Sequence, residues 1–139
     1  MNLTVVSGAI IRNGRILLTQ RRSDTDFPKA WETPGGKVIK HETCYFGLIR
    51  ELEEEIDVTV LSAAFLWRDD FPDMLQAGEK CHVSFWLYHV TAMRREPRSK
   101  EGQGFGWFNQ KEILGLMLAP GTAKAVPTLL KTMERNNGY

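Results

Sequence analysis

Residues 34–58, PGGKVIKHETCYFGLIRELEEEIDV, carry the strongest structural signal in the chain. The segment is typical of a glycine-rich turn, then a short extended run, then a helix from residues 42–43 to about residue 56. The apolar residues of this helix recur at intervals of three and four positions, which predicts one buried stripe. The stripe consists of Tyr45, Leu48, Ile49, Leu52 and Ile56.

The acidic face of the same helix works against helix stability. Glu51 is three and four positions from Glu54 and Glu55, and each like-charge pair costs roughly 0.2–0.5 kcal/mol. The three charges lie towards the helix C-terminus, where the helix dipole favours cations. Gly47 costs about 1 kcal/mol relative to Ala. Unfavourable choices gathered on one face indicate a functional site. A hard divalent cation would compensate the charge, with Gly47 leaving room, whereas the alternative is a solvated acidic face.

The spacing within this segment resembles the Nudix box, GX5EX7REUXEEXGU, in which U is an aliphatic residue. The matching residues span 36–58 and are Gly36, Glu42, Arg50, Glu51, Leu52, Glu54, Glu55 and Val58. One position departs from the pattern, because Asp57 stands where the box has its second glycine. We expect Asp57 to end the helix in the left-handed conformation, which Asp tolerates at some cost. The sequence is therefore similar to the Nudix hydrolases.

The whole chain, residues 1–139, is expected to form one domain with a substantial core. Its hydrophobic content of 42% and charged content of 25% are ordinary for a globular protein, and its formal net charge is +1. This balance favours neither stable nucleic-acid binding nor a membrane partner. Cys44 and Cys81 form no motif and are expected to be reduced thiols. Since no leader or long apolar segment is visible, we expect a cytoplasmic protein, monomeric or homodimeric.

Periodicity and turn residues predict the remaining elements. Strands are expected at 3–11, 15–22, 58–68, 80–92 and 106–109, and further helices at 110–116 and 123–134. Asn13-Gly14 predicts a hairpin turn, and Thr122 is the expected N-cap of the last helix. Residues 23–33 are expected to be a loop anchored by Trp31, residues 69–79 a polar loop and candidate lid, and residues 93–104 a second long loop. The last residues, 135–139, are expected to fray.

This irregular alternation fits a mixed sheet between helices. The Nudix resemblance implies an α/β (α+β) fold, an α/β/α sandwich with a mixed central sheet. The resemblance extends over nearly the whole chain to the MutT-like members, which cleave nucleoside triphosphates. The further matching segments are IIRN at 10–13, the Arg pair 21–22, PGGK at 34–37, FPD at 71–73, KEGQ at 100–103 and Trp107.

The resemblance also implies a Mg²⁺ site, with Mn²⁺ as an alternative since both ions take oxygen ligands. Its ligands would be Glu51, Glu54, Glu55, the Gly35 carbonyl and, from the KEGQ segment, Glu101. For Glu101 the alternative is a solvated loop residue, and Glu79 is the rival fourth carboxylate. Among the catalytic residues, Glu51 is a ligand or the general base, and Arg50 orients the carboxylates by ion pairing. The alternative for Arg50 is an ordinary i,i+4 pair with Glu54, and Glu42 is expected just outside the ligand shell.

Three residues are candidates for substrate binding. Arg22 matches a MutT-like position near the base, and Lys37 is placed to contact phosphate; the alternative for both is a solvated surface side chain. Thr122 falls where MutT has an Asn that reads the oxidised purine. A hydroxyl lacks the donor and acceptor pair of an amide. We therefore expect no strong selectivity for 8-oxo-dGTP.

The function that follows is metal-dependent hydrolysis of a pyrophosphate bond in a nucleoside diphosphate linked to another group. Divalent ions neutralise the phosphate oxygens and lower the pKa of bound water, while a carboxylate accepts the proton. A (d)NTP is the expected substrate, giving a (d)NMP and pyrophosphate. The alternatives are a Nudix hydrolase of another nucleotide, such as a nucleotide sugar or ADP-ribose, and a catalytically silent nucleotide-binding module. The complete REUXEE cluster argues against the silent module.

Overall fold

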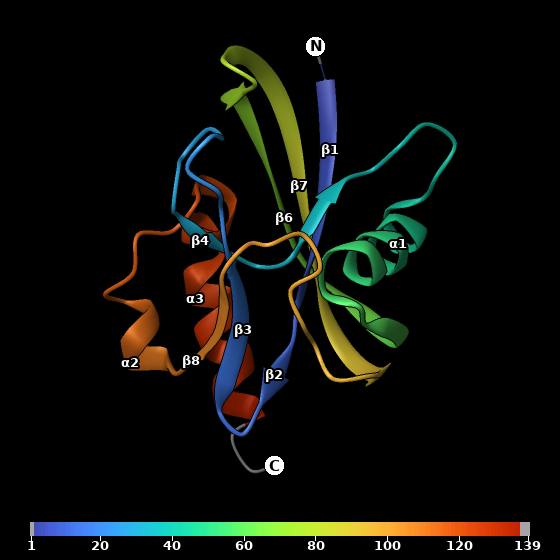
Figure 1. Cartoon of the computed structure of the whole chain (residues 1–139), viewed down its shortest axis with the longest axis vertical. Helices are drawn as coiled ribbons and strands as arrows, with labels where there is room; N and C mark the ends of the chain where they lie inside the picture. Colours follow the sequence, from blue (N-terminus) through green and yellow to red (C-terminus); the bar gives the residue numbers. More distant parts are fainter. Residues whose placement is uncertain (1, 137–139) are drawn as a thin grey trace.

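The computed structural model describes residues 2–136, which form eight strands and three helices (Figure 1). In chain order the elements are β1 Asn2–Ala9, β2 Ile11–Arg12, β3 Arg15–Gln20, β4 Trp31–Glu32, β5 Gly35–Lys37, α1 Cys44–Ile56, β6 Thr59–Gln76, β7 Glu79–Arg94, β8 Phe105–Phe108, α2 Gln110–Ile113 and α3 Pro120–Arg135. No helix within this range is long and apolar enough to cross a membrane.

The strands form two four-stranded sheets. The first has the order β5-β1-β7-β6 and is mixed, because β1 runs parallel to β7 while the other pairs are antiparallel. The second is antiparallel and joins β2, β3 and β4, with β8 on the free side of β3. Asn13 and Gly14 both have positive φ and make the turn from β2 to β3, as the sequence predicted. The predicted mixed sheet between helices is confirmed, with a second sheet beside it.

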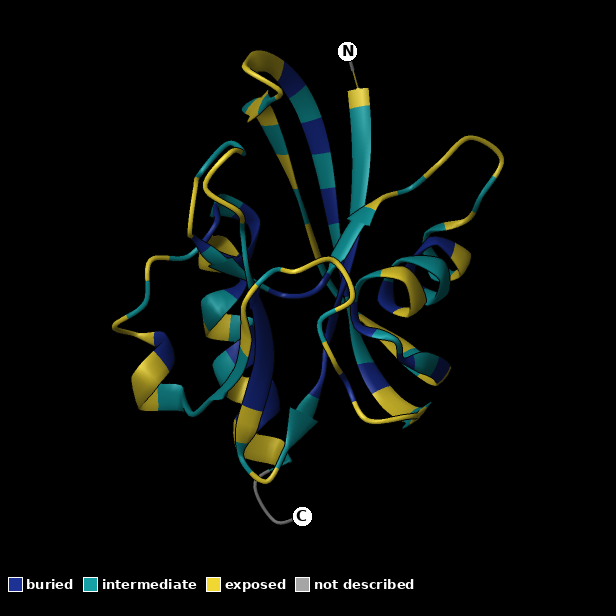
Figure 2. Cartoon of the chain, in the orientation of Figure 1, coloured by how far each residue is buried: buried dark blue, intermediate teal, exposed yellow. Residues whose placement is uncertain are grey.

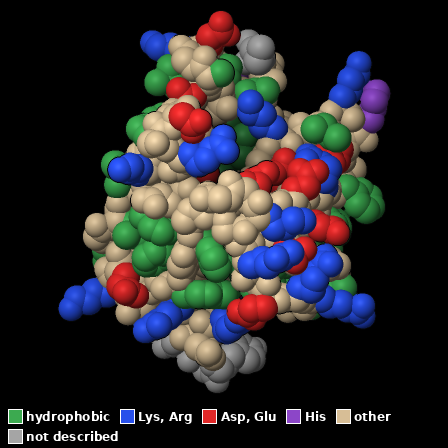
Figure 3. All heavy atoms as spheres, in the orientation of Figure 1, with side chains coloured by type: hydrophobic (Ala, Val, Ile, Leu, Met, Phe, Trp, Pro, Cys, Tyr) green, Lys and Arg blue, Asp and Glu red, His purple; other side chains and the backbone are tan. Residues whose placement is uncertain are grey.

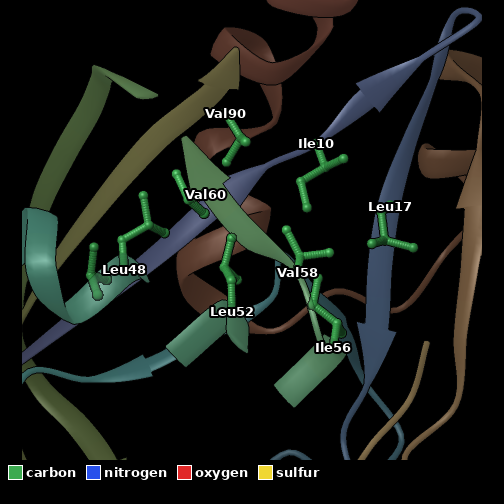
Figure 4. Close-up of a cluster of buried hydrophobic side chains, with 9 residues drawn as sticks. Ile10, Leu17, Leu48, Leu52, Ile56, Val58, Val60 and Val90 are labelled. Atoms are coloured by element: carbon green, nitrogen blue, oxygen red, sulfur yellow. The ribbon is translucent and has the colours of Figure 1, made fainter. Parts of the chain in front are cut away.

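Helix α1 covers one face of the mixed sheet. Its buried side chains Leu48, Leu52 and Ile56 form one cluster with strand residues Val6, Leu17, Val60 and Val90 and with Ile10 and Val58 from the connections beside the strands (Figure 4). Full burial of one such side chain stabilises the fold by about 1.5–3 kcal/mol. The predicted apolar stripe of this helix is confirmed at these three residues, whereas Tyr45 and Ile49 are only partly buried. Figure 2 shows the outer face of the helix exposed. Packing through the stripe leaves the glutamates of the helix outside this apolar cluster.

Helix α3 closes the opposite side of the molecule. Its residues Ala125, Leu129 and Met133 pack with Phe85 and Leu87 of β7 and with β3 in a second buried cluster. The predicted N-cap at Thr122 is wrong, since α3 begins at Pro120 with Ala119 as the N-cap residue. Proline at the first helical position fixes φ and lacks an N–H that would go unpaired there. The helix therefore starts three residues earlier than the hydroxyl signal suggested.

The predicted lid loop at 69–79 is also wrong. Strand β6 runs through residue 76, and β7 begins at residue 79, so the segment is the end of one long hairpin. Ala77 and Gly78 both have positive φ and form its two-residue turn. Residues Asp69 to Phe71 pair with β7, and the register shift between Phe71 and Met74 accommodates Pro72. Polar side chains suggested a loop because this end of the hairpin is largely solvent-exposed.

Several smaller expectations have clear outcomes. The 23–33 segment contains the short strand β4, in which Trp31 packs edge-on against Phe108 at 4.9 Å between ring centroids, confirming Trp31 as an anchor. The predicted last strand and short helix correspond to β8 and α2. The expectation for the C-terminal end falls partly on residues 137–139, which lie outside the described residues.

Candidate functional site

The glycine turn brings the backbone of β5 against the acidic helix. Gly35 pairs with Ser7 and Gly36 with Val6 of β1. A Cβ at Gly35 would collide with the Val6 carbonyl oxygen, and a Cβ at Gly36 would collide with the Glu51 carboxylate. Gly35 therefore permits a backbone approach that no residue with a Cβ would allow, while the absence of a side chain at Gly36 lets the flexible Glu51 carboxylate lie directly against the backbone.

Arg50 ties three carboxylates to this turn. Its Nε and Nη2 donate to the two Glu42 oxygens at 2.7 and 2.9 Å, and its Nη1 donates to Glu51 at 2.9 Å and Glu54 at 3.2 Å. Nη2 also donates to the Lys37 carbonyl oxygen at 2.9 Å. These five bonds use every guanidinium N–H. Arg50 thus orients Glu51 and Glu54 as well as making the i,i+4 pair, and Glu42 fixes Arg50 from the helix start.

The most perturbed carboxyl group of the site is Glu55. Its Oε1 accepts a hydrogen bond from the Gly35 N–H at 3.2 Å. Burial, together with the nearby charges of Glu32, Glu101 and Glu51, raises the pKa of Glu55 to about 8. Burial likewise raises the pKa of Glu32, against the lowering effect of Arg21. Such pKa shifts are typical of functional sites, because they mark charge that the fold itself leaves uncompensated.

The loop after β7 places Glu101 beside this group. The Lys100 N–H and the Gln103 side-chain amide both donate to the Glu55 carbonyl oxygen, at 3.0 and 3.3 Å. In Figure 1 the loop crosses between β3 and α1. Glu101, Glu55 and Glu32 line one cavity of about 220 Å³, together with Thr19, Gln20, Arg21, Arg22, Thr25 and Gln103. Three carboxylates from three separate elements therefore share one polar cavity.

The helix carboxylates are divided between two surroundings. Glu54 borders an open surface groove with Arg50, whereas Glu51 is half-buried against Gly36. Burial raises the pKa of Glu51, and Arg50 opposes that shift. Within residues 2–136, no three His, Cys, Asp or Glu side chains are grouped closely enough to hold a metal ion as they lie. Ligation by both helix carboxylates would therefore require rotation of their side chains away from Arg50.

Gly47 does not have the role that the sequence suggested. It is buried, and a Cβ there would lie 3.0 Å from a Glu42 oxygen and 3.2 Å from Val38. The missing side chain makes room for the segment before the helix, not for a bound group. Asp57 adopts the predicted left-handed conformation at the helix end, with φ 59° and ψ 35°.

The three predicted substrate-binding residues lie in different places. Arg22 borders the polar cavity, its side chain exposed and paired with Asp24 at 3.4 Å. Lys37 borders a second, more apolar cavity of about 160 Å³. Thr122 is buried, and its hydroxyl accepts a hydrogen bond from the Thr33 N–H at 3.0 Å. The residues of α3 that line the apolar cavity are Pro120 and Gly121, with Ala119 just before the helix.

Sequence reasoning missed two residues, Glu32 and Arg21, that line both cavities. Arg21 Nη1 lies 3.4 Å from each Glu32 carboxylate oxygen, and Arg21 Nε donates to the Asp26 carbonyl oxygen at 2.6 Å. The sequence did contain a signal for Glu32, because this residue stands between the anchor Trp31 and the glycine turn. Reading that segment as a loop hid the alternation of β4, which packs Trp31 against the second buried cluster and turns Glu32 towards the cavity that Glu55 also lines.

The comparisons with known proteins agree with this fold and identify its family. A family model described as NUDIX domain matches residues 2–129. The chain is 39% identical over 127 residues to the 8-oxo-dGTP diphosphatase of Haemophilus influenzae, covering 90% of each protein. It is 31% identical over 118 residues to the CTP pyrophosphohydrolase of Escherichia coli, covering 85% of this chain and 84% of that protein.

The comparison with solved structures identifies the same fold. The MutT NUDIX hydrolase of Burkholderia pseudomallei superposes with a TM-score of 0.79 at 30% identity, covering 92% of this chain and 98% of that one. The glycine turn, the helix with its arginine-linked carboxylates and the sheet that carries them define a Nudix domain. The chain belongs to the NUDIX family.

The raised pKa of Glu55 predicts how stability depends on pH. Between the ordinary value of 4.5 and the folded-state value of about 8, the native protein holds a proton that the unfolded chain has lost. With EDTA present, the free energy of unfolding should therefore fall as pH rises through this window. Urea unfolding at pH 5, 6, 7 and 8 measures the slope, which Glu55→Gln should make shallower. An equal slope in the variant would contradict this assignment.

Proposed function

We propose that the chain hydrolyses a pyrophosphate bond in a nucleoside triphosphate and releases a nucleoside monophosphate and pyrophosphate. The observation that carries the proposal is the burial of Glu55 beside Glu32, Glu51 and Glu101, within a Nudix box that departs from its pattern at one residue. A purely structural domain gains nothing from such repulsion. A cation bound by these carboxylates would neutralise it, and phosphate groups would complete the cation's shell.

The donor set fits Mg²⁺ or Mn²⁺, which both prefer oxygen ligands. We assign the ligands to Glu51, Glu54, Glu55, Glu101 and the Gly35 carbonyl oxygen. The fit rests on the uncompensated charge around Glu55 and on the close approach that Gly36 permits. When bound, the ion would shield the phosphate charge and activate water for attack on phosphorus.

The residues of the chain have separable tasks in this proposal. Glu51 is a ligand or the general base, because it is half-buried and held at 2.9 Å from Arg50. Arg50 orients Glu51 and Glu54, and Glu42 keeps the guanidinium in place through two hydrogen bonds. These contacts hold the two carboxylates beside the glycine turn, and their side chains would rotate away from Arg50 to ligate the cation.

The two neighbouring cavities suggest how the substrate divides between them. The apolar cavity is lined by Phe27, Phe71 and Phe85, and we assign the nucleoside to it. The polar cavity is lined by Glu55, Glu101 and Arg22, and we assign the phosphates and cations to it. Lys37 lines the apolar cavity, and we propose that it contacts a phosphate from that side. Arg21 and Glu32 line both cavities and would lie where the sugar meets the phosphates.

The relatives differ in the base of their substrates, since one is an 8-oxo-dGTP diphosphatase and another a CTP pyrophosphohydrolase. The base preference of this chain must therefore be argued from its own residues. The Thr122 hydroxyl accepts a hydrogen bond from the Thr33 N–H, and Thr122 itself is not among the residues that line the apolar cavity. The residues that line this cavity at the start of α3 have no side-chain amide. Strong rejection of a competing base requires buried donors and acceptors matched to one base. We therefore propose broad use of nucleoside triphosphates, without strong selectivity for 8-oxo-dGTP.

The activity is tested by kcat/KM for dGTP, 8-oxo-dGTP, dCTP, dATP and ADP-ribose at one Mg²⁺ concentration. The triphosphates should exceed ADP-ribose, and 8-oxo-dGTP should exceed dGTP by less than about a hundredfold, or about 2.7 kcal/mol. A preference for ADP-ribose would overturn the triphosphate assignment.

Glu54→Gln and Glu55→Gln should nearly abolish turnover in the folded protein. Near-normal kcat of both at saturating Mg²⁺ would overturn the metal assignment, and no activity on any nucleotide would favour a silent binding module.

The fourth carboxylate is tested by comparing Glu101→Gln with Glu79→Gln. Glu101 shares a cavity with Glu55, whereas Glu79 pairs with Gln76 at the turn of the β6–β7 hairpin. Both changes remove one charge from an exposed glutamate, so they are matched. We expect only the Glu101 change to lower kcat and to raise the Mg²⁺ concentration needed for half-maximal activity. Loss of activity in the Glu79 variant alone would show that the hairpin supplies the ligand.

We also propose a cytoplasmic protein, monomeric or homodimeric, that acts on small nucleotides without a stable nucleic-acid or membrane partner. The support is the near-neutral net charge of the sequence, which favours neither a nucleic-acid nor a membrane partner.

A further inference from the structure

Asp57 occupies the one position at which the chain departs from the Nudix box, and two features make it unfavourable there. Its backbone is left-handed, with φ 59°, a conformation that costs a residue with a Cβ roughly 1–2 kcal/mol. Its carboxylate also lies at the C-terminal end of α1, where the helix dipole disfavours negative charge. Helix capping alone would be better served by glycine. The side chain therefore has another reason to be there.

That reason lies in the loop between β7 and β8. Three of its cationic side chains converge on the Asp57 carboxylate. Arg98 Nε lies 2.9 Å from Oδ2, while Lys100 Nζ and Arg95 Nε lie 3.8 and 3.9 Å from Oδ1. The Asp57 side chain is only 19% exposed. Figure 3 shows acidic and basic side chains closely intermixed on this face of the molecule. A network of several charges is more effective than one isolated surface pair.

The backbone of the same loop is attached to the same end of the helix. The Arg98 N–H donates to the Ile56 carbonyl oxygen and the Lys100 N–H to the Glu55 carbonyl oxygen, each at 3.0 Å. The last carbonyl groups of a helix have no partner within the helix, so these bonds satisfy groups that would otherwise need water. Glu101 follows Lys100 directly. The ion pairs and backbone bonds thus hold the residue next to Glu101 against the turn that carries Glu55.

We propose that Asp57 is a positioning residue, whose carboxylate fixes the 95–104 loop on the end of α1 and thereby sets Glu101 beside Glu55. The inference rests on the proposed function, since the purpose of this arrangement is cation binding. It adds that the departure from the box is an adaptation of this chain. A loop held by charge at Asp57 replaces the unstrained helix end that glycine would give.

The direction in which one substitution changes the cation affinity distinguishes anchoring of the loop from a purely electrostatic effect. Arg98→Gln removes a positive charge near the cation site, which by charge alone should tighten cation binding. If Arg98 instead anchors the loop through Asp57, the same change should weaken cation binding. The readout is Mn²⁺ binding without nucleotide, measured from the electron paramagnetic resonance signal of free Mn²⁺. We expect the Kd of Arg98→Gln and of Asp57→Asn to rise about two- to fivefold at low salt. Asn keeps the left-handed conformation accessible.

Two controls complete the experiment. Arg94→Gln removes an equal charge from the end of β7, and its Kd should stay unchanged or fall slightly. In a Glu101→Gln background, Asp57→Asn should have no further effect, because the residue it positions is already lost. Equal or tighter Mn²⁺ binding by Arg98→Gln, or an Asp57 effect that persists without Glu101, would overturn the inference alone. Failure of the unchanged protein to bind Mn²⁺ would overturn the proposed function as well.

Discussion

Burial of Glu55 among like charges is the constraint on which the site depends. The carboxyl group accepts one hydrogen bond from Gly35, yet Glu32, Glu51 and Glu101 together with burial raise its pKa to about 8. Such repulsion persists only where the surrounding fold determines the geometry. Here the apolar stripe of α1 fixes the helix on the mixed sheet, and the glycine turn closes against it.

Arg50 balances that repulsion on the outer side. With all five N–H groups bonded to Glu42, Glu51, Glu54 and the Lys37 carbonyl, it links the start of the helix, its acidic face and the glycine turn. Asp57 and the 95–104 loop close the opposite end. The acidic face is thus held between two ion-pair networks, while Glu55 and Glu101 face the polar cavity.

Local patterns predicted the parts of this structure that depend on local rules. The periodicity of Leu48, Leu52 and Ile56, the Asn13-Gly14 turn and the left-handed Asp57 all follow from sequence spacing and backbone preference. The fold class and the family of the site could be predicted only from the resemblance to the Nudix hydrolases. What failed depended on contacts between distant residues. Glu32 reaches the site through the pairing of β4 with β3, and Thr122 is turned inwards because α3 begins at Pro120. The hairpin end at 69–79 was misread because exposed strands carry polar residues.

The most direct test of the account is the proton released when a cation binds. A Glu55 carboxyl with a pKa of about 8 is mostly protonated at pH 7, and a carboxylate must lose its proton to ligate metal. Calorimetric titration with Mn²⁺ in buffers of different ionisation enthalpy measures this release. The account predicts close to one proton per Glu55 site at pH 7, and almost none for Glu55→Gln. Cation binding without proton release in the unchanged protein would contradict it.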